Sequence, residues 1–456
     1  MQTQIFTVHK RHLGLRAPTV LALGFALTIL VGALVLMLPV SAADGQITPF
    51  LDALFTAASA SCVTGLVTVS TAVHWSVFGK CVILLLIQIG GLGFMSVAAI
   101  ASFVLRRTIT LHERMVMSAG LNLSDGGGIV RLTRRVLFGT FIIEGTGAVL
   151  LSCRFVPHYG FLRGVGMGVF HAVSAFCNGG FDLMGTPDDP FCSLVHYAED
   201  PLVSLTIMAL IVLGGLGFFV WSDVWDKHSF CRLRLHTKIV LTATAGLLLF
   251  GFGWTLLFEW SNPATLGAFD TPHKLLAAAF ESVTLRTAGF NTIDLGALTG
   301  PSQAVSCLLM FIGGSPGSTA GGIKTVTAAV LVLTAISAFC GRTTVSAFGR
   351  TIAPRSIMNA VTLLMAGGVL CLVGACAIAG IEDAPFHQCL FEAVSAFGTV
   401  GVSMGLTPTL AAASRVILIV MMYMGRVGVL TLGVAVFMRR REPPRLKYPD
   451  ADVFIG

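Results

Sequence analysis

We predict an all-α membrane protein built from four tandem repeats, each with two membrane-spanning helices and a short re-entrant segment between them. Three observations lead to this prediction. Of the 456 residues, 55% are hydrophobic and 11% charged, with a mean hydropathy of +0.86, whereas ordinary globular chains carry about 25% charged residues. Eight apolar runs are long enough to cross a bilayer. One short phrase recurs four times between them.

The spans follow from the length of the apolar runs. A hydrocarbon core of about 30 Å requires about 20 helical residues. The first run is too long for the apolar part of a signal peptide, so we expect it to remain in the protein. An even number of spans places both chain ends on one side. The eight runs are residues 18–38, 77–105, 133–153, 202–222, 237–258, 303–337, 357–380 and 412–438.

The distribution of charge predicts the orientation. The chain ends and alternate loops hold 21 of the 29 Lys and Arg residues, whereas the opposite segments are rich in Asp and Glu. By the positive-inside rule the basic face, with both termini, is cytoplasmic. An acidic outer face would concentrate cations near any pore mouth.

The composition also excludes several classes of protein, namely a secreted disulfide scaffold, a nucleic-acid module and a disordered chain. The 11 cysteines are scattered through apolar stretches, with no CxxC pair and no partnered histidine. Clustered nucleophiles, bases or metal ligands are not found, so we do not expect an enzyme. The glycine-rich stretches lie inside spans, so neither a P-loop nor a dinucleotide fingerprint is credible.

The recurring phrase defines the repeats. It reads FTAASASCVTG at residues 55–65, FHAVSAFCNGG at 170–180, FESVTLRTAG at 280–289 and FEAVSAFGTVG at 391–401. Its final glycines are spaced by 115, 109 and 112 residues. We therefore expect repeats at residues 1–115, 116–230, 231–345 and 346–456, the last including a cytoplasmic tail.

Each phrase has an apolar half, too short to cross the membrane, followed by a glycine that tolerates positive φ. Non-helical backbone at membrane depth survives only where protein or a water-filled cavity satisfies it. Four such loops on one face suggest a pore lined by backbone carbonyls, which replace the hydration shell of potassium. Ordinary tight turns between helices are the alternative interpretation. The expected filter residues are Val63, Thr64, Gly65, Asn178, Gly179, Gly180, Thr287, Ala288, Gly289, Thr399, Val400 and Gly401, with potassium at the carbonyls of Thr64, Asn178, Thr287 and Thr399.

The sixth apolar run is interrupted by GGSPGSTAGG at residues 313–322. Glycine costs a helix about 1 kcal/mol and proline about 3 kcal/mol relative to alanine, so this stretch should unwind. Unwound backbone must face the pore or another cavity; a hinge or packing kink of small residues is the alternative. The residues concerned are Gly313, Gly314, Ser315, Pro316, Gly317, Ser318, Thr319, Ala320, Gly321 and Gly322.

Three ionisable residues lie deep in expected spans: Glu144, Lys324 and Arg426. Each charge costs at least ~2.5 kcal/mol there, so each needs a partner or water. A fixed charge at Arg426 would repel a permeating cation. Lys324 either does the same or extends to the inner surface. Glu144 either neutralises one of these cations or makes a helix hydrogen bond.

Polar residues flank the phrases as well. His171, Glu281 and Glu392 occupy one repeated position, where they either line the outer mouth or, as we favour, make a structural hydrogen bond. Asp182 and Asn291, just beyond their glycines, are better placed to meet a hydrated ion.

From about residue 17 to residue 438 the chain resembles the Trk/Ktr/HKT superfamily of potassium transporters, and most closely the KtrB-type ion-conducting subunit. The markers are CVTGL at residues 62–66, LLIQIGGLGFM at 85–95, FCNGGFD at 176–182, LRTAGFNT at 285–292, MFIGGSPGSTAGGIKT at 310–325, SAFGTVG at 395–401 and MGRVG at 424–428. Gly179 stands where the family usually has alanine.

The resemblance implies a pseudo-tetrameric, potassium-channel-like pore with eight transmembrane and four re-entrant pore helices. It implies that residues 313–322 form an intramembrane gating loop, with Arg426 beside it. It also implies potassium uptake across the bacterial inner membrane, a homodimer, and a cytosolic ring of nucleotide-binding RCK-type subunits. Ktr systems as a family suggest that sodium modulates the flux. A sodium- or proton-coupled secondary transporter is the alternative function.

Overall fold

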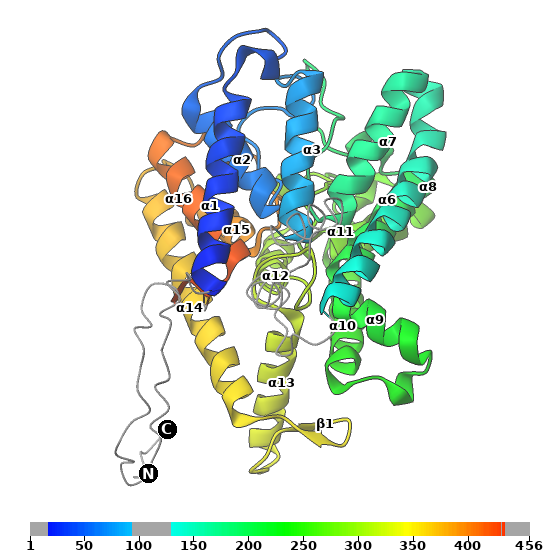
Figure 1. The fold of residues 1–456 in the computed structure, drawn as a ribbon, viewed down its shortest axis with the longest axis vertical. Coiled ribbons are helices and arrows are strands. Elements are labelled where there is room, and N and C mark those ends of the chain that lie inside the picture. The colour runs from blue at the N-terminus through cyan, green and yellow to red at the C-terminus, as the bar shows by residue number, and fades with distance from the viewer. Residues whose placement is uncertain (1–16, 94–128, 430, 434–456) are drawn as a thin grey trace, which may run out of the picture.

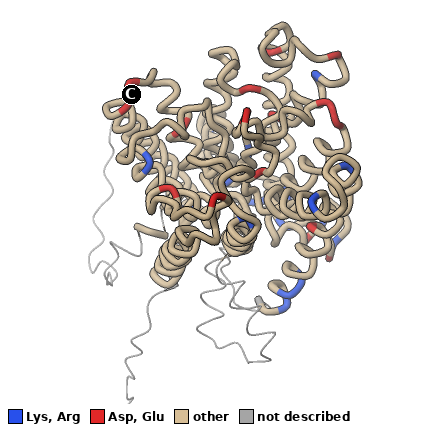
Figure 2. The backbone as a smooth tube through the Cα atoms, turned by 90° about the horizontal axis from the view of Figure 1, so that it is seen from above, with Lys and Arg blue, Asp and Glu red and all other residues tan. Residues whose placement is uncertain are grey.

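The computed structural model describes residues 17–93, 129–429 and 431–433, and this part of the chain is predominantly helical (Figure 1). Charged residues occupy few, scattered positions along the backbone (Figure 2). A two-stranded antiparallel ribbon joins β1 (Ser346–Ala347) to β2 (Arg350–Thr351). Apolar helices therefore account for the architecture.

Within the described residues, four helices are long and apolar enough to cross a membrane, and a bent pair raises this number to five if it forms one span. The long helices carry large exposed apolar side chains, such as Leu27 at 62% exposure, as expected for surfaces that face lipid. The prediction of a membrane protein made of apolar helices is confirmed. The four are α1 (Ala17–Leu36), α6 (Ile129–Tyr159), α10 (Leu235–Glu259) and α14 (Pro354–Ala379).

A short helix follows each long one. These short helices have 13 to 16 residues, hence about 20 to 24 Å of length at 1.5 Å per residue, which is less than a bilayer core of about 30 Å. Each packs on the long helix before it. The short helices are α2 (Phe50–Cys62), α7 (Phe161–Phe176), α11 (Thr271–Thr284) and α15 (Phe386–Gly398).

The helix or helix pair after each short helix completes the element order. These elements are α3 (Val77–Leu92), α8 (Pro201–Gly215) with α9 (Phe218–Lys227), α12 (Gly300–Phe311) with α13 (Thr325–Phe339), and α16 (Ala412–Val427). Short 3-10 turns lie at Pro39–Ser41, Val195–Tyr197, Phe230–Arg232, Leu266–Ala268, Leu295–Ala297 and Thr407–Thr409. In Figure 1, α12 lies centrally, between α6–α8 on one side and α14–α16 on the other.

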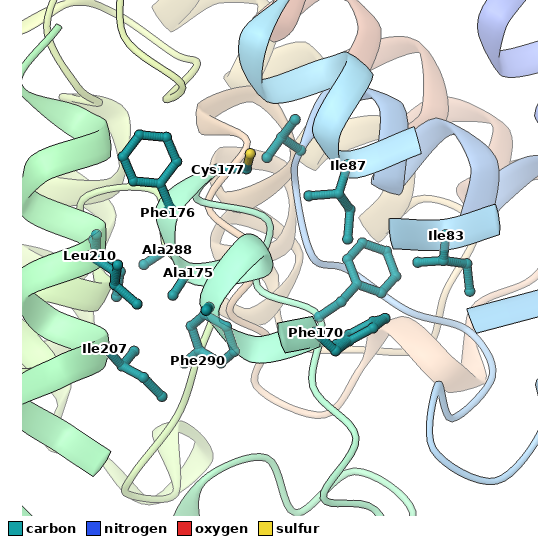
Figure 3. Packing of buried hydrophobic residues seen from close by; sticks show 14 of the residues in the cluster. Ile83, Ile87, Phe170, Ala175, Phe176, Cys177, Ile207, Leu210, Ala288 and Phe290 are labelled. Carbon is teal, nitrogen blue, oxygen red and sulfur yellow. The ribbon is translucent and has the colours of Figure 1, made fainter. Parts of the chain in front are cut away.

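The core lies around the short helices, whose carboxyl halves are almost completely buried. Figure 3 shows Ile87 of α3 beside Cys177, just past the end of α7, with Ile83 and Phe170 nearby. On the opposite side of α7, Ile207 and Leu210 of α8 join the same cluster. This packing fixes the ends of the short helices, and hence the loops that follow them.

The helices α3, α8 and α16, which follow the first, second and fourth loops, end within two residues of a glycine with positive φ. The predicted span 202–222 is wrong as one continuous helix, because α8 and α9 meet at an angle of 92°. The break falls at Gly217, whose φ of +95° is readily adopted only by glycine. Gly93 and Gly428, with φ of +81° and +90°, end α3 and α16 in the same way. The remainder of expected spans 77–105 and 412–438 lies largely outside the described residues.

Candidate functional site

The four loops after the short helices share one unusual backbone conformation. Val63, Asn178, Thr287 and Thr399 have left-handed φ values of 58°, 60°, 64° and 51°. Two residues later, the four glycines also have positive φ, of 95°, 68°, 84° and 94° for Gly65, Gly180, Gly289 and Gly401. Alternating left-handed and ordinary residues point successive carbonyls to one side of a strand, instead of to both. The loops therefore have the backbone geometry that a row of inward carbonyls requires.

The glycines of the four loops meet in a closed ring. A Cβ atom on Gly65 would lie 2.8 Å from the carbonyl oxygen of Gly179, and one on Gly180 would lie 2.8 Å from that of Ala288. A Cβ atom on Gly289 would lie 2.9 Å from the Val400 oxygen. Gly401 closes the ring, because its Cβ would collide with the Thr64 oxygen. A side chain at any of the four glycines would obstruct the next loop.

A cavity of about 440 Å³ lies directly over this ring. All four glycines form part of its wall, and Asp182, Asp189 and Asp294 add carboxylates to it. Asn291 lines the same cavity. The expectation that Asp182 and Asn291 lie near the entrance to the ring therefore agrees with their positions. Carboxylates that line a cavity raise the local concentration of cations.

A hydroxyl from each short helix holds its loop in place, a feature that the sequence analysis missed. Gly65 N donates to Ser59 Oγ at 3.0 Å, and Ser174 Oγ donates to the Phe181 oxygen at 2.8 Å. Thr284 Oγ1 donates to the Phe290 oxygen at 2.6 Å, and Ser395 Oγ to the Val402 oxygen at 2.6 Å. The signal was present, because a Ser or Thr stands six residues before each loop glycine, or five in the third copy.

The second residue of the phrase makes structural hydrogen bonds in two of the four copies. His171 Nε2 accepts from Leu183 N at 3.2 Å. The Glu392 carboxylate accepts from the hydroxyls of Ser403 and Thr407 and from Met404 N. Glu281 is also buried, at 1% exposure, but its carboxylate has no hydrogen-bond partner among the described residues. The structural interpretation that we favoured therefore suits His171 and Glu392.

Residues 312–324 separate α12 from α13 and form no helix. Thr319 Oγ1 donates to Asn178 Oδ1 at 2.9 Å and to the Phe176 oxygen at 3.2 Å. The segment also contacts the third and fourth loops. A Cβ on Gly321 would collide with Thr399 of the fourth loop, and one on Gly313 would lie 3.2 Å from a methyl group of Thr287 in the third. The segment therefore lies against three of the four loops.

Two of the three predicted membrane charges contact this segment. Arg426 donates to the carbonyl oxygen of Thr319 and to those of Gly90 and Gly91 at the end of α3. Lys324 Nζ donates to the Ala320 oxygen at 2.6 Å. Both cations are thus neutralised in part by carbonyl dipoles, and they bind the segment to its surroundings.

Glu144 lies elsewhere, since its carboxylate accepts from Gln88 Nε2 at 3.1 Å and contacts Cys177 Sγ at 3.8 Å. These contacts agree with the expected hydrogen bond to a helix, here to Gln88 of α3, rather than with neutralisation of Lys324 or Arg426. The sequence analysis also missed Arg286, which is 7% exposed and donates to the Gly313 oxygen at 3.3 Å. Its signal was a charge inside the third phrase, where the other copies have small or apolar residues.

Four buried backbone loops, converging beneath an acidic cavity in an apolar helical fold, define a membrane protein of the cation-transport class. A family model described as TrkH, cation transport protein, matches residues 20–442. The chain therefore belongs to this family, and the predicted resemblance is confirmed.

Relatives of known name match over nearly the whole chain. It is 42% identical over 439 residues to Ktr system potassium uptake protein B of Bacillus subtilis, covering 96% of each chain. It is 39% identical over 441 residues to potassium/sodium uptake protein NtpJ of Enterococcus hirae, again covering 96% of each. These relatives are uptake proteins, in agreement with the prediction that the chain is not an enzyme.

A solved structure shows the same fold. The crystal structure of the potassium transporter TrkH from Vibrio parahaemolyticus superposes with a TM-score of 0.71 at 17% identity. The match covers 94% of this chain and 86% of that chain. The helical architecture predicted from the sequence thus corresponds to the TrkH fold.

Proposed function

We propose that the chain conducts potassium across the membrane through an axial path, with the ring of four loops as its selectivity filter. The single observation that carries this proposal is the closed cycle of contacts from Gly65 through Gly180 and Gly289 to Gly401. Backbone carbonyls in such a ring replace the water that an entering ion sheds, without a fixed charge that would trap it. The carbonyls of Thr64, Asn178, Thr287 and Thr399 are the proposed ligands.

The repeats provide the symmetry that this filter requires. Each proposed unit contains a long helix, a short pore helix with its loop, and an inner helix, within residues 1–115, 116–230, 231–345 and 346–456. Eight spans and four pore helices result. The order long helix, short helix, further apolar helix recurs four times in the described chain and supports this division.

Potassium is the proposed substrate because the named relatives are potassium uptake proteins. One of them is named a potassium/sodium uptake protein, which keeps sodium as a second ion or modulator in the proposal. Each loop has one glycine at the ring, and the Tyr-Gly extension of longer potassium filters is replaced by other residues. Fewer coordinating layers should give weaker discrimination between the two ions.

Residues 313–322 are the proposed gate, with Lys324 and Arg426 as its fixed cations. Thr319 and Gly321 lie against the second and fourth loops on the side that does not border the outer cavity. A cation leaving the filter would meet this segment and the guanidinium of Arg426. Movement of the segment would then open the path.

The same proposal includes a cytosolic RCK-type regulatory ring, a homodimer, and a bacterial inner membrane with both termini inside. The Ktr system names of the relatives support a regulatory partner. Most of the basic loop 106–135 and the tail after residue 438, where docking is expected, lie outside the described residues.

Tracer uptake into liposomes tests the proposal. Liposomes loaded with potassium and diluted into a potassium-free, sodium-free buffer should accumulate external rubidium tracer, driven by about 2.3 kcal/mol per 100 mV. Gly180→Ala should lower accumulation, because its Cβ would lie 2.8 Å from the Ala288 oxygen and the neighbouring loop must shift. Gly246→Ala is the matched control, since its Cβ would meet no atom of the described residues within 4 Å.

The same assay separates a pore from a coupled carrier. A protonophore is added and sodium is omitted, so that no second ion has a usable gradient. Accumulation that persists supports the pore, whereas uptake that requires sodium or a proton gradient supports the secondary transporter. Equal uptake by Gly180→Ala and the unmodified chain would contradict the filter.

A further inference from the structure

Three side chains with metal-binding atoms lie together in the outer loop that follows the second filter loop. One ligand atom each from Asp189, Cys192 and His196 lie within 4.8 Å of one another. The sequence analysis found no histidine partnered with a cysteine, and the structure corrects this: the two are four residues apart and converge. The corresponding outer segments of the other three repeats offer no such group among the described residues.

Local backbone contacts bring these side chains together. Thr186 N donates to the Asp189 oxygen at 3.0 Å, and Asp189 N to Thr186 Oγ1 at 3.1 Å, so the backbone of Asp189 closes a turn. Val195 N donates to the Cys192 oxygen at 3.2 Å. The 3-10 turn Val195–Tyr197 that follows carries His196 back toward Cys192. The cluster is therefore held by hydrogen bonds that do not use its three ligand groups.

The donor set matches zinc chemistry. Sulfur, imidazole nitrogen and carboxylate oxygen are the ligands of zinc sites, with bonds of about 2.0 to 2.3 Å, which place ligand atoms about 3.3 to 3.8 Å apart. Small side-chain rotations close the gap from 4.8 Å. Three protein ligands leave a fourth tetrahedral position for water. Asp189 and His196 are exposed, so a metal ion can enter from solvent.

The thiol of Cys192 needs a metal to become a ligand. Cys192 must lose its thiol proton to bind zinc as a thiolate. Zinc binding would form the metal–sulfur bond and release that one proton to solvent, with no change of oxidation state. A fortuitous cluster in a surface loop would instead leave the thiol hydrogen-bonded to the Met184 oxygen, at 3.4 Å.

We propose that Asp189, Cys192 and His196 bind Zn²⁺ at the rim of the outer cavity, and that the bound ion reduces cation entry. Asp189 and Cys192 also line the cavity over the four glycines. The two charges of Zn²⁺ would be balanced by the Asp189 carboxylate and the Cys192 thiolate, so the mouth would lose the negative charge of Asp189 and attract potassium less strongly. Zinc binding does not depend on the proposed function. The effect of zinc on cation flux does depend on it.

The loop that holds the cluster is also joined to the third filter loop. Leu194 N donates to the Asn291 oxygen at 2.9 Å, and Asn291 N donates to Ser193 Oγ at 3.1 Å. Asn291 follows Gly289 by two residues. A metal ion that orders residues 189–196 would therefore also restrain the outer end of the filter, in addition to its electrostatic effect.

Titration calorimetry on the purified full chain tests the binding. We expect one Zn²⁺ per chain with a micromolar or lower Kd, weakened at least tenfold in Cys192→Ser, Asp189→Asn and His196→Ala. The matched controls Asp188→Asn, Cys153→Ser and His158→Ala should bind like the unmodified chain. With Co²⁺ as the probe, a thiolate-to-cobalt charge-transfer band should appear and be absent in Cys192→Ser. Binding that is weak, or equal in Cys192→Ser and the controls, overturns the site.

External Zn²⁺ in the liposome assay tests the effect on flux. Zn²⁺ should lower rubidium uptake at least twofold, EDTA should restore it, and Cys192→Ser should be insensitive. Each variant is compared with itself without metal, so a change in its basal flux does not affect the result. Inhibition that survives Cys192→Ser, or calorimetric binding without inhibition, overturns the proposed control of entry. Absence of uptake before any metal is added would count against the proposed function, while the calorimetry would still decide the site.

Discussion

Arg426 donates to the carbonyl oxygen of Thr319, while the hydroxyl of that threonine donates to Asn178 in the second loop. One residue of the non-helical segment thus connects the last helix to the ring of glycine loops. The same guanidinium also donates to the carbonyl oxygens at the end of α3. A substitution of Arg426 should therefore loosen the non-helical segment and also change its position relative to the ring.

Arg426→Ala should raise cation flux. A hydrogen bond to a charged group contributes about 1.5–3 kcal/mol, so its loss should favour the displaced segment by roughly tenfold or more. Removal of a fixed positive charge lowers the barrier further. Rubidium uptake at fixed membrane potential measures the change. Arg163→Ala is the control, because Arg163 lies in α7, far from Arg426 in the sequence. Flux equal to that of the unmodified chain would exclude Arg426 from the gate.

Gly65→Ser should lower the ratio of potassium to sodium flux. The serine Cβ would lie 2.8 Å from the Gly179 oxygen, and φ at this position is +95°. The neighbouring loop must shift to relieve this contact, so we expect the ratio to fall about tenfold, which corresponds to about 1.4 kcal/mol. Competition between sodium and rubidium tracer measures it. Gly45→Ser is the control, because Gly45 also has positive φ, +70°, but has open space around it.

Ser395→Ala should destabilise the fourth loop. Ser395 Oγ donates to the Val402 oxygen at 2.6 Å and accepts from Gly401 N at 3.2 Å, so its removal leaves two buried backbone groups unpaired. We expect a loss of about 1–3 kcal/mol in the free energy of unfolding and a lower potassium preference. Ser414→Ala is the matched control, since this buried hydroxyl has no hydrogen-bond partner in the described part of the chain. Thermal unfolding and tracer competition should distinguish the two variants, and equal behaviour would contradict the role of Ser395 in holding the fourth loop.

The four filter loops could be predicted from the sequence. Each phrase ends in a glycine, because the loop needs a positive φ there, and this glycine recurs at nearly constant spacing. The break at Gly217 could not, since hydropathy remains high across GGLGFF and carries no information on φ. Ser59 and its counterparts were missed because a small hydroxyl in an apolar helix resembles a space-filling residue until its acceptor is seen. Arg286 was missed because it lies within the third recurring phrase and not in an expected span. The convergence of Cys192 with His196 was missed because it depends on a turn that hydrophobic periodicity does not predict.

Glu392 and Glu281 occupy one repeated position and should respond differently to the same substitution. The Glu392 carboxylate accepts hydrogen bonds from Ser403, Met404 and Thr407, whereas that of Glu281 accepts none among the described residues. Glu392→Gln replaces one of the two acceptor oxygens by a donor, which would face either Thr407 Oγ1 or both Ser403 Oγ and Met404 N, and should cost about 1–3 kcal/mol of unfolding free energy. Glu281→Gln removes a buried carboxylate that lacks a partner, and should be neutral or stabilising. Thermal unfolding of the two variants side by side measures the difference; a larger loss in Glu281→Gln would mean that its carboxylate has a partner, such as a bound water or ion, in the folded protein.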